Sequence, residues 1–182
     1  MDAPFDLSRC APRADQPAGR SRRRASAFPR SVVVVESVYA AAGGDAGLVR
    51  LAQAWHERVL ADEVVAHAFR PPLHPHHVER LAAYWAEALG GPTTYSATMG
   101  EETEVVRAHS GNGPHGDMDD RAIACFAAAL DDVGLEDPVR SVLLAYFTWA
   151  TRTTMAAYED SADDVPEGLR IPHWSWDGLQ PA

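Results

Sequence analysis

Apolar residues recur at helical spacing in several segments, and glycine, proline or polar residues separate these segments. The predicted helices cover residues 45–60, 76–89, 104–109, 117–133 and 137–158, with a short apolar segment at 33–42 and a brief helical turn at 64–68. No alternating strand pattern is present, and the helices are too short and too unevenly spaced for a simple four-helix bundle. The pattern therefore predicts an all-α domain.

Local signals set the expected ends of these helices. Gly43-Gly44 predicts a stop, and Asp45 is the expected cap of the helix that follows. Asp137 followed by Pro138 is typical of a helix start, with the proline in the first turn. Residues 93–103 carry no helical periodicity and are predicted to be a loop.

Composition divides the chain into three parts. Residues 1–30 are rich in proline, arginine and serine and hold seven arginines against three acidic residues, which predicts a disordered basic leader. Residues 31–158 form the predicted domain, and residues 159–182 a tail that becomes rich in tryptophan and proline. Beyond the leader, the chain holds nine arginines and twenty-three acidic residues. Such an acidic body argues against nucleic-acid binding.

Composition also excludes several kinds of chemistry. The chain contains no lysine, which excludes a Schiff base on lysine and a Walker-type phosphate loop. No apolar run approaches the roughly 20 residues of a membrane helix, so no membrane association is expected. Cys10 and Cys125 lie in unlike surroundings, a polar tail and an apolar run, so we expect no disulfide and a reducing cytoplasm.

Histidine is the most informative residue type, and His109 is the first candidate. It closes the short helix 104–109, directly before a glycine-rich break. At a helix end, an unpaired carbonyl can accept one ring N–H while the other nitrogen ligates iron. From the residues alone, a favourable contact with the helix dipole explains this histidine equally well or better.

A second group of histidines lies at positions 74, 76 and 77. Their spacing does not give the facing pair of a helical zinc site. His77 shares an apolar helix face with Leu81 and Tyr84, so it either finds a partner in the core or lines a cavity. Arg80, slightly to the side, is placed to reach a ligand carboxylate. His56 falls between two helix faces, which leaves both surface and pocket open.

Taken in order, these motifs resemble the group II truncated haemoglobins of bacteria over about residues 38–155. Tyr39-Ala-Ala-Ala-Gly-Gly44 is similar to the family's opening helix, and Glu79-Arg80-Leu81 with the run Gly90-Gly-Pro-Thr-Thr-Tyr-Ser96 to its distal helix and following loop. Val106-Arg107-Ala108-His109 resembles the turn that carries the proximal histidine. The segments 128–135 and 145–147 resemble the last two helices.

The resemblance implies a two-over-two helical sandwich that holds haem b, with His109 as the iron ligand. It places His77, with Leu81 one turn later, at the distal position facing bound ligand, and His56 where the family usually has a tyrosine. Arg80 matches the cation that pairs with a haem propionate. The remaining haem contacts that the resemblance implies are Phe69, Tyr95, Arg107, Ala122 and Phe147.

Two departures change the expected distal chemistry. Group II members normally carry a tryptophan on the penultimate helix, where this chain has Ala122. With His56 in place of the tyrosine, the usual pair of donors for bound oxygen is absent. The loop after His109 also lacks the family's Pro-Phe element. We therefore expect a roomier pocket with imidazole rather than indole and phenol groups.

The sequence leads to one main functional hypothesis and two alternatives. In the first, the chain binds a small gas such as O2 or NO, or turns over peroxide, with His77 and His56 as acid or base groups. A separate reductase and a homodimer are both compatible with it. In the second, a haem enzyme oxidises a small organic substrate in a pocket widened by Ala122. In the third, a globin fold without haem serves as a scaffold or sensor.

Overall fold

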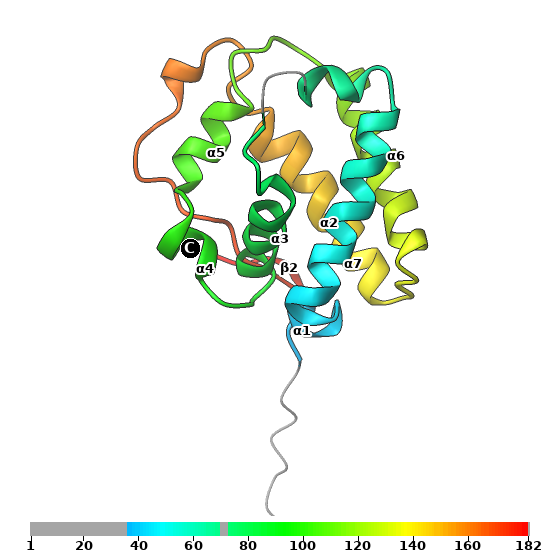
Figure 1. Ribbon diagram of the computed structural model, residues 1–182. Helices are drawn as coiled ribbons and strands as arrows, with labels where there is room; N and C mark the ends of the chain where they lie inside the picture. Colours follow the sequence, from blue (N-terminus) through cyan, green and yellow to red (C-terminus); the bar gives the residue numbers. More distant parts are fainter. Residues whose placement is uncertain (1–35, 70–72, 182) are drawn as a thin grey trace, which may run out of the picture. The chain divides into compact units, whose positions relative to one another are not determined.

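The computed structural model describes residues 36–69 and 73–181, and the predicted leader at 1–30 lies outside these residues. Figure 1 shows helices throughout the body, with one small hairpin near the end of the chain. The α-helices are α1 (Val38–Ala41), α2 (Gly44–Ala61), α3 (His77–Ala88), α4 (Thr94–Thr98), α5 (Glu102–Ala108), α6 (Gly116–Asp132) and α7 (Val139–Trp149). A 3-10 turn, η1 (Val65–Phe69), lies between α2 and α3. The expected all-α fold is confirmed.

Two packed helix pairs make up the body. α2 packs against both α3 and α6, and α6 packs against α7. The buried positions of α2 recur at helical spacing and contribute Leu48, Leu51 and Val59, each fully buried. Leu130 of α6 and Leu143 of α7 close the core from the other pair. This is the two-over-two arrangement that the resemblance implies.

Gly47 is what allows α1 to lie directly against α2. A side-chain Cβ at this position would lie 1.9 Å from the carbonyl oxygen of Ala42, which ends α1. Gly43, with φ of 92°, makes the turn between the two helices. The predicted stop at Gly43-Gly44 is therefore confirmed. Asp45 does not cap α2 as predicted: it lies inside the first turn and accepts a hydrogen bond from the Tyr39 hydroxyl at 3.1 Å.

The predicted loop at 93–103 is wrong at both ends. Residues 94–98 form α4, and α5 begins at Glu102 rather than at Glu104. The reason is tertiary: the buried Glu87 carboxylate of α3 accepts hydrogen bonds from the backbone N–H and the hydroxyl of Ser96. These bonds, with the buried Tyr95 ring, hold a segment that has no periodicity of its own.

The last helix ends earlier than predicted. α7 stops at Trp149 and continues as a π-helical segment, η2 (Ala150–Met155), and Pro138 is the N-cap rather than the first helical residue. Among the described residues, no helix is both long and apolar enough to cross a membrane.

The tail is irregular except for two short elements. A 3-10 turn, η3 (Ala162–Asp164), is followed by an antiparallel pair of two-residue strands, β1 (Trp174–Ser175) and β2 (Gly178–Leu179). Ile171 is buried within the core cluster of the helices. The tail is thus packed into the body.

Candidate functional site

His109 is the C-cap of α5, and its ring is held in one tautomer. Its Nδ1 lies 2.8 Å from the carbonyl oxygen of Val105, one turn earlier. A carbonyl only accepts hydrogen bonds, so Nδ1 carries the proton and Nε2 keeps a free lone pair. This is the backbone contact that a histidine needs to present Nε2 to a metal.

The environment of His109 indicates a side chain that faces an opening. The side chain is exposed to water, yet burial by the surrounding protein lowers the pKa of its imidazole, against the opposing effect of the Val105 carbonyl. A side chain in a recess shows both properties, because water reaches it although protein surrounds it. The imidazole is therefore neutral at neutral pH, the form that ligates metals.

His77 and His56 come together as the sequence analysis predicts for a shared pocket. Their ring centroids lie 5.2 Å apart. The buried Nε2 of His77 and the buried Nδ1 of His56 have no hydrogen-bond partner within the described residues. Burial lowers the pKa of both imidazoles, and His56, His109 and Arg80 lower that of His77 further. His109 is therefore near enough to His77 to influence the pKa of its imidazole.

Aromatic rings line the distal end of this space. The Phe69 ring contacts the rings of His56 at 5.5 Å, His77 at 5.9 Å and Trp55 at 5.9 Å between centroids. Trp55 also packs edge-on against Phe147, at 5.5 Å. The two distal histidines therefore stand against an apolar wall, where an unpaired ring nitrogen is costly unless a ligand pairs with it.

Ala122 lies where α6 meets this wall. It is half-buried, and its carbonyl oxygen accepts a hydrogen bond from Trp55 Nε1 at 3.2 Å. The Trp55 indole therefore reaches this part of the wall from α2, although α6 has alanine where the resemblance would place a tryptophan. Phe147, an expected haem contact, is buried and stacks on Phe126 at 4.1 Å. It forms the floor of the aromatic cluster.

Arg80, the expected propionate partner, lies beside Tyr95, another expected haem contact. Arg80 donates to the carbonyl oxygen of Met99 at 2.7 Å, and its guanidinium lies 5.5 Å from the centroid of the Tyr95 ring. Tyr95 is buried, whereas Leu81 is half-buried on the same helix as His77. Arg80 keeps further N–H donors for an anion, so its role at a propionate stays a prediction.

Arg107 points to a different partner from the one expected. Its guanidinium donates to the carbonyl oxygen of Val165 at 3.2 Å and to the Glu167 carboxylate at 2.8 Å. Both partners belong to the C-terminal tail. The structure thus connects Arg107 with the tail, and a haem contact for this residue stays a prediction.

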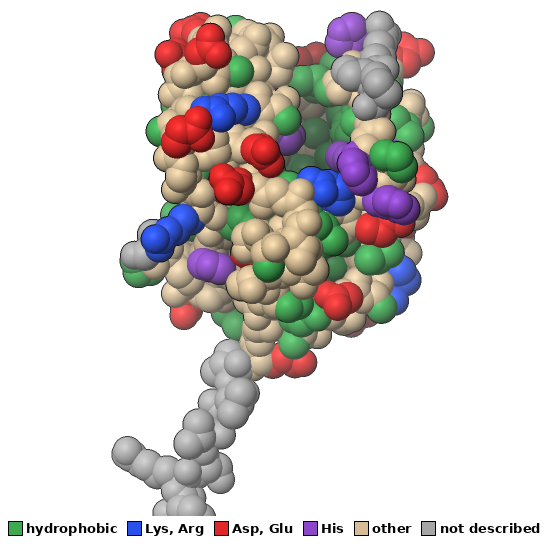
Figure 2. Space-filling model, turned by 60° about the vertical axis from the view of Figure 1, so that its left-hand side comes forward, with side chains coloured by type: hydrophobic (Ala, Val, Ile, Leu, Met, Phe, Trp, Pro, Cys, Tyr) green, Lys and Arg blue, Asp and Glu red, His purple; other side chains and the backbone are tan. Residues whose placement is uncertain are grey.

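One face of the molecule is hollowed. Figure 2 shows this hollow lined by hydrophobic side chains, with histidine and basic side chains at and within its edge. Haem requires a free axial nitrogen on one side, apolar walls and polar groups on the ligand side. His109 Nε2, the ring of Phe69 and the two unpaired distal nitrogens supply these features. The residues present fit the group.

Sequence reasoning missed two parts of the site. Trp55 belongs to the apolar stripe of its helix, which by itself indicates a core residue, although its hydrogen bond to Ala122 makes it part of the pocket wall. Glu102 was placed in a loop, yet it is 3% exposed and accepts a hydrogen bond from Tyr84 at 3.2 Å. A carboxylate inside an apolar run would have been the signal, but residues 101–104 are mostly acidic and suggest a solvated turn.

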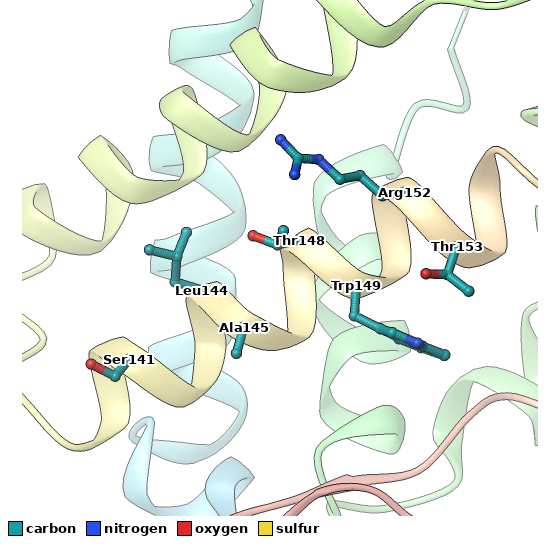
Figure 3. Close-up of a pocket in the computed structure, with 7 residues that line it drawn as sticks. All are labelled: Ser141, Leu144, Ala145, Thr148, Trp149, Arg152 and Thr153. Carbon is teal, nitrogen blue, oxygen red and sulfur yellow. The ribbon is translucent and has the colours of Figure 1, made fainter.

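A second, open groove lies along α7 and η2. Figure 3 shows its lining, in which Leu144 and Trp149 are the large apolar side chains and Arg152 lies toward one end. None of the predicted site residues lines this groove. Arg152 is paired with Asp120 of α6 at 2.6 Å.

Comparisons with known proteins identify the family and the fold of the chain. The family described as bacterial-like globin matches residues 37–156. The structure of haemoglobin from Chloroflexus aurantiacus is 27% identical, with a TM-score of 0.59 over 66% of this chain and 98% of that one. A group 1 truncated haemoglobin of Tetrahymena pyriformis is 27% identical over 57% of this chain and 82% of its own length. The group II truncated haemoglobin of Bacillus anthracis shares the fold at 18% identity, with a TM-score of 0.58 over 66% and 91%.

The chain belongs to the bacterial-like globin family and has the truncated globin fold. The matched region begins one residue before α1 and ends just after η2. It includes every residue of the candidate site, whereas the C-terminal tail lies beyond it.

Proposed function

We propose that this globin binds haem b in the hollow, with His109 Nε2 as the iron ligand. The observation that carries the proposal is the bond from His109 Nδ1 to the Val105 carbonyl, which leaves the lone pair of Nε2 free to bind a metal. Haem supplies an iron that binds small diatomic molecules and takes part in redox chemistry.

The distal histidines define what this chain adds to that chemistry. Both imidazoles are neutral at neutral pH because burial lowers the pKa of each. A neutral imidazole either donates a hydrogen bond to a bound ligand or accepts its proton, depending on the tautomer. His77 and His56, 5.2 Å apart, provide two such groups side by side. We therefore propose binding of O2 or NO, or turnover of peroxide, as the activity.

An absorption spectrum of the purified protein tests haem binding directly. We expect a Soret band that shifts on addition of carbon monoxide, and loss of most of this signal in His109→Ala. His173→Ala, which changes an exposed histidine of the tail, is the matched control. Wild-type protein that takes up no haem on reconstitution would overturn the proposal and favour a haem-free scaffold.

A second candidate is oxidation of a small organic substrate beside the iron. The half-buried Ala122 favours it, because its small side chain leaves the α6 side of the wall without a large group of its own. Substrate-dependent spectral shifts that disappear in Ala122→Trp would support this candidate. Shifts that persist in the variant would count against it.

Finer assignments follow from the same site. The run from Gly90 to Ser96, with the distal helix before it, supports placement among the group II members. Within the described residues the half-buried Cys125 forms no disulfide, in keeping with a reducing cytoplasm. A separate reductase would then be needed to keep the iron ferrous.

A further inference from the structure

The C-terminal tail runs along the helix that carries His109. Figure 1 shows the segment after η2, drawn in orange, passing beside α5 before it turns toward β1. This segment begins after residue 156, where the match to the globin family ends. Its contacts with α5 therefore come from outside the matched region.

Thr103 is the strongest of these contacts. Its side chain is 1% exposed, and its hydroxyl donates to the Pro166 carbonyl at 3.2 Å. The same hydroxyl accepts a hydrogen bond from the backbone N–H of Leu169 at 3.1 Å. One side chain of α5 thus satisfies a backbone acceptor and a backbone donor of the tail.

Further contacts lie on both sides of His109 in the sequence. Before it, Arg107 binds Val165 and Glu167, as described above. After it, the backbone N–H groups of Gly111 and Gly113 donate to the carbonyl oxygens of Tyr158 and Glu159, at 3.0 and 2.9 Å. His109 therefore lies between two sets of hydrogen bonds to the same segment.

The tail is itself anchored to the body. Val165 is 3% exposed, and Ile171 belongs to the core cluster. Farther along, Trp174 packs against Tyr146 of α7, at 5.9 Å between ring centroids. Trp176 Nε1 donates to the carbonyl oxygen of Glu36 at 2.6 Å. A segment fixed in this way can hold α5 in place.

We propose that residues 158–169 form a strap that fixes α5, and that Thr103 acts through this strap as a positioning residue for His109. An isolated helix of seven residues is unstable in water, so α5 depends on such outside contacts for its position. The effect on iron rests on the proposed haem binding. The effect on α5 does not.

Thr103→Val tests the strap because valine keeps the shape of threonine but leaves Pro166 and Leu169 without their partner. We expect about tenfold faster haem release and a shifted or broadened iron–histidine stretching band in the resonance Raman spectrum. Thr103→Ser keeps the hydroxyl, so its rate of haem release and its stretching band should be those of the wild type. Thr98→Val, in an exposed turn of α4, is the matched control and leaves both unchanged.

Ile171→Ala removes an anchor of the strap without changing any residue of α5. It provides a second test of the strap if Thr103→Val does not fold. We expect the same change in the stretching band. Val59→Ala, a core truncation in α2, should lower stability but leave the stretching band unchanged. An unchanged band in both strap variants overturns the proposal.

Haem-free protein separates the strap from haem binding. In Thr103→Val, the amides of α5 should exchange hydrogen about tenfold faster, while those of α2 keep their wild-type rates. Equal exchange in α5 overturns the strap, whatever the iron does. If wild-type protein takes up no haem but α5 is loosened in this way, the proposed function fails and the strap stands.

Discussion

Glu102 is a carboxyl group that the fold keeps from water. It belongs to the helix that carries His109, and it contacts α3 through the Tyr84 hydroxyl. Its second oxygen and the hydroxyl of Tyr146 are buried without a partner in the described residues. Burial raises the pKa of Glu102 to about 7, and the hydrogen bond from Tyr84 opposes this only in part. Its charge therefore changes near neutral pH.

This shift predicts a pH dependence of stability. Between pH about 4.5 and about 7, folded Glu102 keeps a proton that the unfolded chain has lost, so stability falls as pH rises through this window. The full effect is on the order of 3 kcal/mol. Glu102→Gln should remove this slope and be more stable than wild type at pH about 8, as measured by urea unfolding.

Glu63→Gln changes an exposed carboxylate and serves as the control for this measurement. It should leave the slope as in the wild type. If the free energy of unfolding changed with pH in the same way in wild type and Glu102→Gln, the prediction would be wrong. Glu102 would then have the same pKa in the folded and the unfolded chain.

The unpaired nitrogen of His77 leads to a second prediction. If it pairs with a ligand on the iron, His77→Ala should raise the ligand dissociation rate about tenfold, the effect of losing one hydrogen bond in an apolar pocket. Stopped-flow displacement of bound oxygen measures this rate. His74→Ala, on the exposed side of the same segment, should leave it unchanged. Identical rates in the two variants would remove His77 from the distal site.

At the scale of elements, the contact between α1 and α2 depends on the absence of a side chain at Gly47. Gly47→Ala places a Cβ 1.9 Å from a backbone oxygen, so the two helices must separate. We expect a loss of about 3 kcal/mol in the free energy of unfolding. Thermal or urea denaturation followed by circular dichroism provides the measurement.

Gly116→Ala is the matched control, since nothing lies within 4 Å of a Cβ at the start of α6. Alanine there should leave stability unchanged or raise it slightly. If Gly47→Ala were equally harmless, the close approach of α1 to α2 would not be needed for folding.

The elements that sequence predicts well are those whose own periodicity decides their structure. α2, α3 and α6 were expected within one or two residues of their ends, because each buries a regular apolar stripe. α4 was missed because Glu87, from another helix, holds it in place. The sequence placed His109 at a helix end, but the Val105 contact and the pairing of His77 with His56 needed the fold.

At the scale of the whole molecule, haem binding and folding are coupled. A ligand that binds only the folded chain stabilises it by about 3 kcal/mol at a hundredfold excess over its dissociation constant. Added haemin should therefore raise the melting temperature by roughly 5–10 °C. His109→Ala should lose most of this increase, and His173→Ala should keep it. Equal increases in both variants would point to nonspecific binding.

The bond between Trp176 and Glu36 joins residues 140 positions apart. A ribosome makes the chain in order, so α5 and His109 emerge well before the segment that holds them. The helices of residues 37–156 can collapse as they appear, but α5 gains its contacts with the strap only after residues 158–169 have been added. If the strap positions His109 as proposed, haem that arrives before this segment is made meets a histidine not yet held in place.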